Sequence, residues 1–291
     1  MRIEPARQQR AASLGVSAHD NGPLMAALRR HIARLERSHP LLEKPHARSR
    51  PWTLGLAEID AHLAAQGLAR AGLHDIRPAA YGDMPAAMGF ALALALRRLA
   101  DPTERRPVLW CRLAREEREY GRLYGHGLEA LGLARGRFVT VTLKKPVHLL
   151  WTAEAALKSG ALALVLADAD PKQADLTATR RLALAAAAGK AAGLLVFARP
   201  HGGATASHTR WLAAAARSRS PPYDAEAPGA PLWTVQLIRA RGGRPGAWTV
   251  EWQHAPHRFA VVSGLRGGAF HPWTDESPEN PAARQAALRA G

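Results

Sequence analysis

The chain is poor in cysteine, lysine and long apolar runs, and each shortage excludes a class of protein. Of the 291 residues only one is a cysteine, Cys111, which rules out a disulfide scaffold and any zinc or iron–sulfur site built on cysteines. No uncharged apolar run approaches the roughly 18 residues that a membrane-spanning helix needs. The first residues carry no apolar signal segment. We therefore expect a cytoplasmic protein.

Acidic residues are also scarce relative to basic ones. Lys+Arg number 40 and Asp+Glu 24, which gives a formal net charge of +16, and only six of the basic residues are lysine. Guanidinium groups bind phosphate and carboxylate in bidentate fashion, so this excess favours a nucleic-acid or acidic-protein partner. A GC-rich genome would enrich arginine and alanine in the same way, and composition leaves both explanations open.

We divide the chain into four segments. Residues 1–22 are polar and irregular and are predicted to be disordered, whereas residues 23–51 comprise a helix and a linker. Residues 52–266 form the folded domain, and residues 267–291 form a flexible tail. The helix, residues 23–37, carries an apolar stripe that would pack on the domain or dock a partner, and its members are Leu24, Leu28, Ile32 and Leu35.

The folded domain is predicted to be α/β, with a mostly parallel sheet flanked by helices. Short apolar runs of strand length begin near residues 73, 107, 138, 161 and 193 and alternate with helical patterns over 86–99, 116–131, 147–158 and 175–188. After residue 208 the helical patterns stop. Four further strands, two of them joined by the turn sequence RGGRPG, predict a C-terminal antiparallel extension.

This order of elements resembles the RecA-like ATPase core, and the chain is more closely similar to the ImuA family of RecA-related accessory proteins. The segments that carry the likeness are VLWC at 108–111, LYGHGLEALGL at 123–133, WTAEAALKSGALALVL at 151–166, DLTATRRLALAAAAG at 175–189 and LIRARGGRPGAWTVEW at 237–252. The resemblance spans residues 20–265.

The RecA resemblance implies a phosphate-binding loop after the first strand, and here that loop is degenerate. Such loops have the pattern GxxxxGK[ST], in which backbone N–H groups cradle phosphate, lysine neutralises it and Ser/Thr holds Mg²⁺. Residues 78–90 contain no lysine, serine or threonine, and what remains is Tyr81, Gly82, Asp83 and Gly89. We therefore expect no ATP hydrolysis, no catalytic residues and no cofactor.

Asp168 stands at the end of an acidic strand, where the resemblance implies a magnesium-contacting aspartate of the Walker B type. An aspartate at this point also simply caps a turn, and without the lysine we favour that second interpretation. Among the other candidates, the histidines show no metal-ligand spacing, so no metal is expected. Cys111 lies within an apolar run and is predicted to be a buried hydrophobic residue.

Two basic segments are candidates for binding nucleic acid or a partner. The first follows the strand near residue 193, where the resemblance implies a DNA-contacting loop. The second is the RGGRPG hairpin, whose Trp side chains would lie on one face of the strand. The candidates are Arg199, His201, Gly202, Gly203, His208 and Arg210 in the loop, and Arg239, Arg241, Arg244, Trp248 and Trp252 in the hairpin. The alternatives are a flexible connection and an ordinary strand pair.

Family resemblance implies a non-catalytic adaptor in SOS-induced mutagenic translesion DNA synthesis. The implied partners are ImuB, which is a Y-family-like scaffold, an error-prone C-family polymerase and RecA, with single-stranded DNA as a further candidate. Two other functions remain open: a RecA-type DNA-binding ATPase and a cell-division inhibitor of the SulA type.

Overall fold

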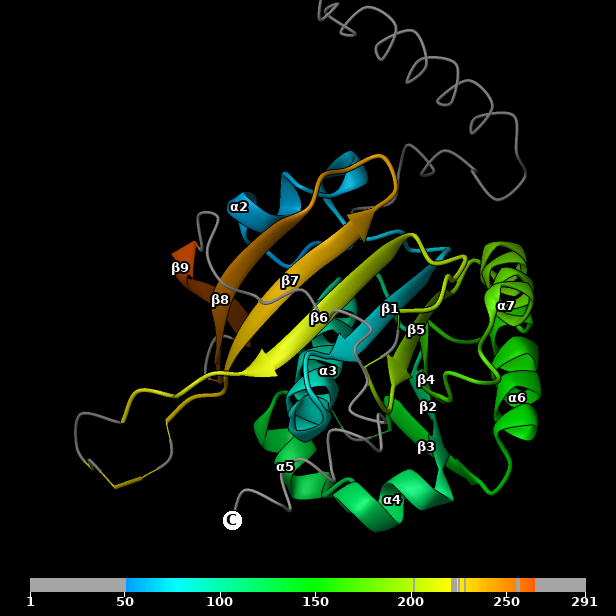
Figure 1. Ribbon diagram of the computed structural model, residues 1–291, viewed down its shortest axis with the longest axis horizontal. Helices are drawn as coiled ribbons and strands as arrows, with labels where there is room; N and C mark the ends of the chain where they lie inside the picture. The colour runs from blue at the N-terminus through cyan, green and yellow to red at the C-terminus, as the bar shows by residue number, and fades with distance from the viewer. Residues whose placement is uncertain are drawn as a thin grey trace, which may run out of the picture. The chain divides into compact units, whose positions relative to one another are not determined.

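A nine-stranded mixed sheet runs through the computed structural model of the protein, which describes residues 51–264 except 135, 201, 221–223, 225, 228, 255 and 256 (Figure 1). In chain order the elements are α2 (Ala57–Asp60), the 3₁₀ turn η2 (Ala64–Gln66), β1 (Leu73–Pro78), the 3₁₀ turn η3 (Tyr81–Asp83), α3 (Met84–Leu99), β2 (Val108–Leu113), α4 (Ala114–Tyr120), α5 (Gly125–Ala130), β3 (Phe138–Leu143), α6 (Pro146–Lys158), β4 (Leu164–Ala169), α7 (Leu176–Gly189), β5 (Ala192–Phe197), β6 (Thr209–Ala215), β7 (Leu232–Ala240), β8 (Gly246–Gln253) and β9 (Arg258–Gly264).

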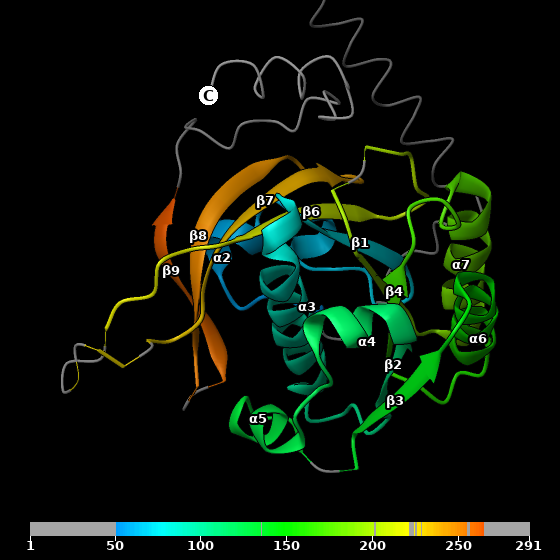
Figure 2. The same cartoon turned by 60° about the horizontal axis from the view of Figure 1, so that its bottom comes forward.

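The strand order is β3-β2-β4-β5-β1-β6-β7-β8-β9. Every pairing from β3 to β6 is parallel, and every pairing from β6 to β9 is antiparallel. This arrangement confirms the predicted α/β class with its C-terminal antiparallel extension. The helices lie on both faces of the parallel half, with α3 on one face and α6 and α7 on the other (Figures 1 and 2).

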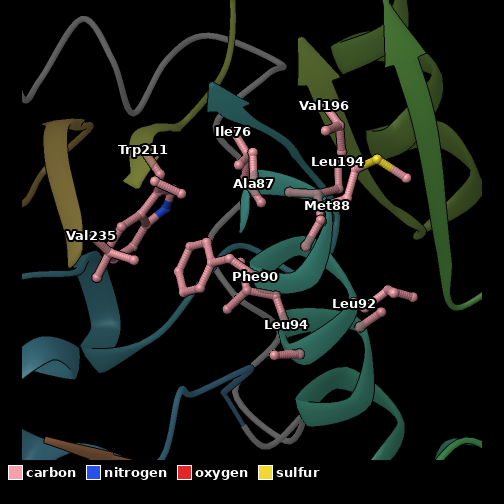
Figure 3. Close-up of a cluster of buried hydrophobic side chains, with 14 of the residues drawn as sticks. Ile76, Ala87, Met88, Phe90, Leu92, Leu94, Leu194, Val196, Trp211 and Val235 are labelled. Atoms are coloured by element: carbon pink, nitrogen blue, oxygen red, sulfur yellow. The ribbon is translucent and has the colours of Figure 1, made fainter. Parts of the chain in front are cut away.

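Helix α3 forms the centre of the main hydrophobic core. Its alanine- and leucine-rich sequence favours helix, and Phe90 packs against Trp211 with ring centroids 5.6 Å apart. Figure 3 shows Phe90 and Met88 directed towards strand residues that include Ile76 and Val196. These residues are buried. Fully burying such side chains contributes about 1.5–3 kcal/mol each, so α3 holds β1, β5, β6 and β7 in one core.

Helices α6 and α7 pack against each other as well as on the sheet. The closest approach is at Gly189, where a methyl group would lie 1.8 Å from the Leu157 carbonyl oxygen. Glycine is therefore the residue that lets α7 end against α6. Helix α7 begins with an N-cap in which Asp175 accepts a hydrogen bond of 2.7 Å from the Ala178 N–H.

The structure corrects two expectations about local structure. The single helix predicted over 116–131 is wrong: α4 ends at Tyr120 and α5 begins at Gly125. Gly121 has φ +82°, a conformation that glycine adopts without strain, and this breaks the helix. The expectation that the strands are nearly all apolar and buried is wrong for β3, the edge strand of the parallel half, where Val139 is exposed.

Several predicted segments lie outside the described residues. These are the disordered start, the helix over 23–37 with Leu24, Leu28, Ile32 and Leu35, and the tail over 267–291. Within the described part of the chain, no helix is long and apolar enough to cross a membrane.

Candidate functional site

The ends of the parallel strands bring together the residues that the sequence singled out. Because β1, β2, β4 and β5 are parallel, the segments that follow them meet at one edge of the sheet. In α/β sheets this edge is where ligands bind. Here it carries the loop from β1 to α3, Asp168 of β4 and Arg199 after β5.

The loop between β1 and α3 is short and is held by its own carboxylate. Asp83 Oδ2 accepts a hydrogen bond of 3.0 Å from the Ala80 N–H, and Asp83 Oδ1 accepts one of 3.0 Å from the Ala215 N–H at the end of β6. In a phosphate-binding loop, backbone N–H groups at this point in the fold are directed at phosphate oxygens. In this protein a side-chain carboxylate occupies two such donors and ties the loop to β6.

Gly89 and Tyr81 have separate places. Gly89 lies within α3, and a methyl group there would come within 3.1 Å of the Trp233 ring, so its small size serves packing between α3 and β7. Tyr81 is half-exposed in η3. Its hydroxyl donates to the Glu119 carboxylate, which lowers the pKa of Glu119. The guanidinium of Arg199 lies 5.8 Å from the centre of the Tyr81 ring. Arg199 is exposed and remains accessible to a partner.

Asp168 is buried and its hydrogen-bonding capacity is used by the protein itself. It accepts from the Trp110 indole N–H at 2.8 Å, from the Leu113 backbone N–H at 3.0 Å and from Arg112 Nε at 3.4 Å. Burial raises the pKa of Asp168, while Arg112, the Leu113 N–H and the Trp110 N–H act in the opposite direction. The contacts join the end of β4 to β2. They account for Asp168 as a structural residue, in line with the interpretation we favoured.

The glycine-rich segment after β5 is a packed crossover and not a free loop. Because β5 and β6 are both parallel to β1, the connection must return from one end of the sheet to the other. Buried Asp75 of β1 holds it there: the carboxylate accepts from the hydroxyls of Thr205, at 2.6 Å, and Ser207. Arg210 also pairs with Asp75, with 3.4 Å between Nε and Oδ2.

Most of the predicted binding residues in this crossover are therefore engaged. The Gly203 carbonyl accepts from Arg77 at 3.1 Å and from Arg210 at 2.9 Å. The His208 ring packs 6.1 Å from that of His74, and burial lowers the pKa of His208 to about 3. Gly202 is exposed, whereas His201 lies outside the described residues. The structure corrects the expectation of a mobile connection because buried hydrogen bonds fix it to β1 and β6.

The Arg/Trp hairpin is also partly internal. Trp248 and Trp252 do lie on the same side of β8, as predicted, but that side faces the core and both are buried. The expectation that they form an exposed binding face is therefore corrected. Arg239 donates to the carbonyls of Thr205, at 3.2 Å, and Ser207. Arg241 and Arg244 lie at the turn and bond through their backbone N–H groups to the carbonyls of His208 and His62, respectively.

A different surface, which the sequence analysis did not single out, carries exposed apolar side chains. On the outer side of α6 and α7, Val147, Trp151, Leu176 and Leu184 are all exposed, and Trp151 is 57% exposed. We call these four residues the α6–α7 face. Next to them is a depression of about 260 Å³, which Trp151, Glu154 and Arg181 help to line. Exposed apolar patches of this kind mark sites of protein contact.

Conventional catalytic groups are not assembled in the described part of the chain. No group of three or more His, Cys, Asp or Glu side chains there is placed to hold a metal ion. Cys111 is buried in β2, and burial together with nearby Asp168 raises the pKa of its thiol to about 12. A thiol with such a pKa is not a nucleophile at neutral pH.

Comparison with known proteins gives one clear similarity. The chain is 34% identical over 226 residues to Protein ImuA from two strains of *Caulobacter vibrioides*, NA1000 / CB15N and ATCC 19089 / CIP 103742 / CB 15, with 73% of this chain and 89% of each relative covered. A solved structure of SulA from *Pseudomonas aeruginosa* is 21% identical, with a TM-score of 0.34, over 43% of this chain and 96% of SulA. No family model matches. The similarity to the *Caulobacter* proteins places this chain in the ImuA family.

Proposed function

We propose that the protein is a non-catalytic accessory of SOS-induced mutagenic translesion DNA synthesis, acting in the cytoplasm. It docks with ImuB, with an error-prone C-family polymerase and with RecA. Membership of the ImuA family supports a role in the ImuA–ImuB mutagenesis system. The proposal adds that the role is one of binding and that the protein uses no nucleotide.

The observation that carries the proposal is the closed loop after β1. A nucleotide would need free backbone N–H groups and a lysine at this point. Residues 78–90 offer no lysine, and Asp83 brings a negative charge while bonding the N–H groups of Ala80 and Ala215. A carboxylate in this position repels phosphate. Asp168, the second relic of nucleotide chemistry, is bonded by its own neighbours.

The α6–α7 face supports docking, and we assign it to ImuB as the scaffold of the assembly. Its four exposed apolar residues lie on regular helices, so they form a pre-organised surface whose burial needs little ordering. The rim is charged, with Glu154 paired to Lys158 at 2.7 Å and to Arg181 at 2.6 Å. An apolar centre with a polar rim is the usual composition of a protein interface.

The test is co-purification from damaged cells with nuclease present, together with an ATP turnover assay on the purified full chain. Wild-type protein is expected to recover ImuB, the polymerase and RecA and to turn over no ATP. Trp151→Glu places a charge on the α6–α7 face and should reduce ImuB recovery at least about tenfold, as expected of an interface anchor. The matched control is Tyr124→Glu, at a residue 70% exposed on another part of the surface.

Each alternative has its own outcome. Steady ATP turnover that depends on Asp83 or Asp168 would support a RecA-type ATPase and contradict the proposal. Cell filamentation on overproduction, without recovery of any of the three partners, would support a division inhibitor. Equal loss of ImuB with Trp151→Glu and Tyr124→Glu would refute the assignment of the α6–α7 face.

A further inference from the structure

A second hollow in the protein lies on the opposite side of the sheet from the α6–α7 face, between α3 and the antiparallel extension. It has a volume of about 240 Å³. One wall is a single face of α3, formed by Pro85, Gly89, Ala93 and Leu96, and the other walls are Leu131 at the end of α5, Pro231 and Trp233 of the β7 region, and Trp252 of β8. The lining is apolar with one exception.

That exception is the indole nitrogen of Trp252. The Trp252 side chain is fully buried, and its Nε1 has no hydrogen-bond partner among the described residues. The Trp52 and Trp211 indoles, which are also buried, donate to the Leu94 carbonyl at 3.1 Å and to Thr209 Oγ1 at 3.0 Å. Buried polar groups are normally satisfied, so an unpaired donor in the wall of a hollow indicates an acceptor that is supplied from outside.

The size and lining of the hollow restrict what that ligand is. Pockets for drug-sized molecules and cofactors typically measure about 300–1,000 Å³, which is more than this hollow offers. Its volume suits one bulky apolar side chain. A peptide that inserts such a side chain brings main-chain carbonyls beside it, and one of these would accept from the indole N–H of Trp252. Anchor side chains in pockets of this kind dominate many protein interfaces.

The charge of the chain restricts the partner further. With a net charge of +16, the protein attracts acidic segments and repels basic ones. We propose that the Trp233–Trp252 pocket receives one bulky apolar side chain, with a neighbouring carbonyl, from an acidic segment of a partner protein. The inference does not depend on the proposed function, since it requires only a peptide of this chemistry.

Gly89 explains how the pocket is formed. Because a methyl group at this position would come within 3.1 Å of the Trp233 ring, glycine allows that ring to lie directly against α3. Trp252 is fixed on the other side by an edge-to-face contact with Phe259, with ring centroids 5.1 Å apart. The pocket is therefore bounded by rigid elements, and a side chain can enter without rearrangement of the core.

The test uses the indole N–H resonances of the ¹⁵N-labelled full-length protein, which has eight tryptophans. The probe is N-acetyl-phenylalaninamide, and N-acetyl-alaninamide is the control. We expect the phenylalanine amide to shift the Trp252 and Trp233 resonances saturably, and the Trp52 and Trp211 resonances to stay unchanged. A phenylalanine flanked by glutamates in a pentapeptide should bind at least about fivefold more tightly at low salt than the same peptide flanked by lysines.

Two variants keep the test specific. Ala93→Leu fills the pocket and should abolish the response, whereas Ala155→Leu, on the exposed side of α6, should leave it intact. If Ala93→Leu fails to fold by circular dichroism, Trp252→Phe serves in its place. It removes only the donor and should weaken binding, followed at Trp233, about fivefold.

Three results would overturn the inference. The first is the absence of any saturable shift at Trp233 and Trp252 in the wild-type chain. The second is a shift that appears only in the full-length variant Phe270→Ala/Trp273→Ala, which would assign the pocket to the protein's own C-terminal segment. The third is equal binding of the acidic and basic peptides, which would remove the acidic partner.

Discussion

Substitution of Asp168 separates a structural carboxylate from a magnesium-binding one. In the structure this carboxylate accepts three hydrogen bonds, from Trp110, Leu113 and Arg112, and all of these groups are buried or lie in the backbone of β2. Asp168→Asn removes the charge and turns one oxygen into an NH₂ group. That group faces N–H donors, and the buried guanidinium of Arg112 loses its carboxylate partner.

The magnitude follows from burial. Breaking a buried ion pair by removing one partner typically costs about 3–5 kcal/mol. For a domain of this size each kcal/mol lowers Tm by about 2–4 °C, so the expected fall is about 6–20 °C. Asp170→Asn is the matched control, because Asp170 pairs with Arg115 on the surface and an exposed pair contributes about 1 kcal/mol or less.

The assay is thermal and urea unfolding followed by circular dichroism, with and without MgCl₂ and ATP. We expect Asp168→Asn to be strongly destabilised and Asp170→Asn to be close to wild type, with no effect of magnesium on either. The double variant Arg112→Met/Asp168→Leu should recover much of the stability, because an apolar pair leaves no charge unpaired.

Two results would refute this reasoning. A loss below about 1 kcal/mol for Asp168→Asn would mean that the hydrogen bonds to Asp168 do not hold β4 to β2. A rise in the wild-type Tm with magnesium and ATP that is absent in Asp168→Asn would mean that the aspartate serves a nucleotide site.

Three further predictions concern other buried groups. Cys111, whose thiol pKa is raised to about 12, should not react with Ellman's reagent at pH 8 until urea unfolds the protein, and rapid reaction of the native protein would contradict its burial. Burial lowers the pKa of His74 to about 4 from an ordinary 6.5, so below pH 6.5 the unfolded chain takes up a proton that the folded one does not; stability should fall by about 1.4 kcal/mol per pH unit from pH 6.5 towards 4, and urea titrations should find this slope lost in His74→Gln but kept in His126→Gln. Gly189→Ala should lower the free energy of unfolding by about 1–3 kcal/mol or more through its clash with the Leu157 carbonyl, although the same change at an unhindered helical position gains about 1 kcal/mol; an unchanged urea midpoint would show that α6 and α7 can move apart.

The sequence was a good guide to the elements of the sheet. The five strands predicted from apolar runs are all present, and so are the four strands of the extension. The pattern succeeded because strands buried on both faces need apolar residues at nearly every position. It failed at β3, since a run of the same composition also fits an edge strand, and edge position depends on the order of strands in the sheet.

The candidate site was predicted only in part. The absence of lysine from residues 78–90 was visible in the sequence, but the partner of Asp83 was not, because Ala215 lies 132 residues away. Asp75 was missed altogether. A charged residue inside the strand sequence LHDIRP was the available signal, since a buried charge needs a partner. Trp248 and Trp252 were placed on the correct side of their strand, but not in the core.

The sequence by itself determined the α/β alternation, the missing phosphate-loop lysine and the basic charge, because these depend on residue type and local period. The tertiary structure decided which of the arginines and tryptophans remain free to bind. Arg210 is bonded to Asp75, 135 residues earlier, while Trp151 is left exposed on α6. The physical reason is that burial and hydrogen bonding depend on which distant strands and helices meet, and local pattern carries no record of that meeting.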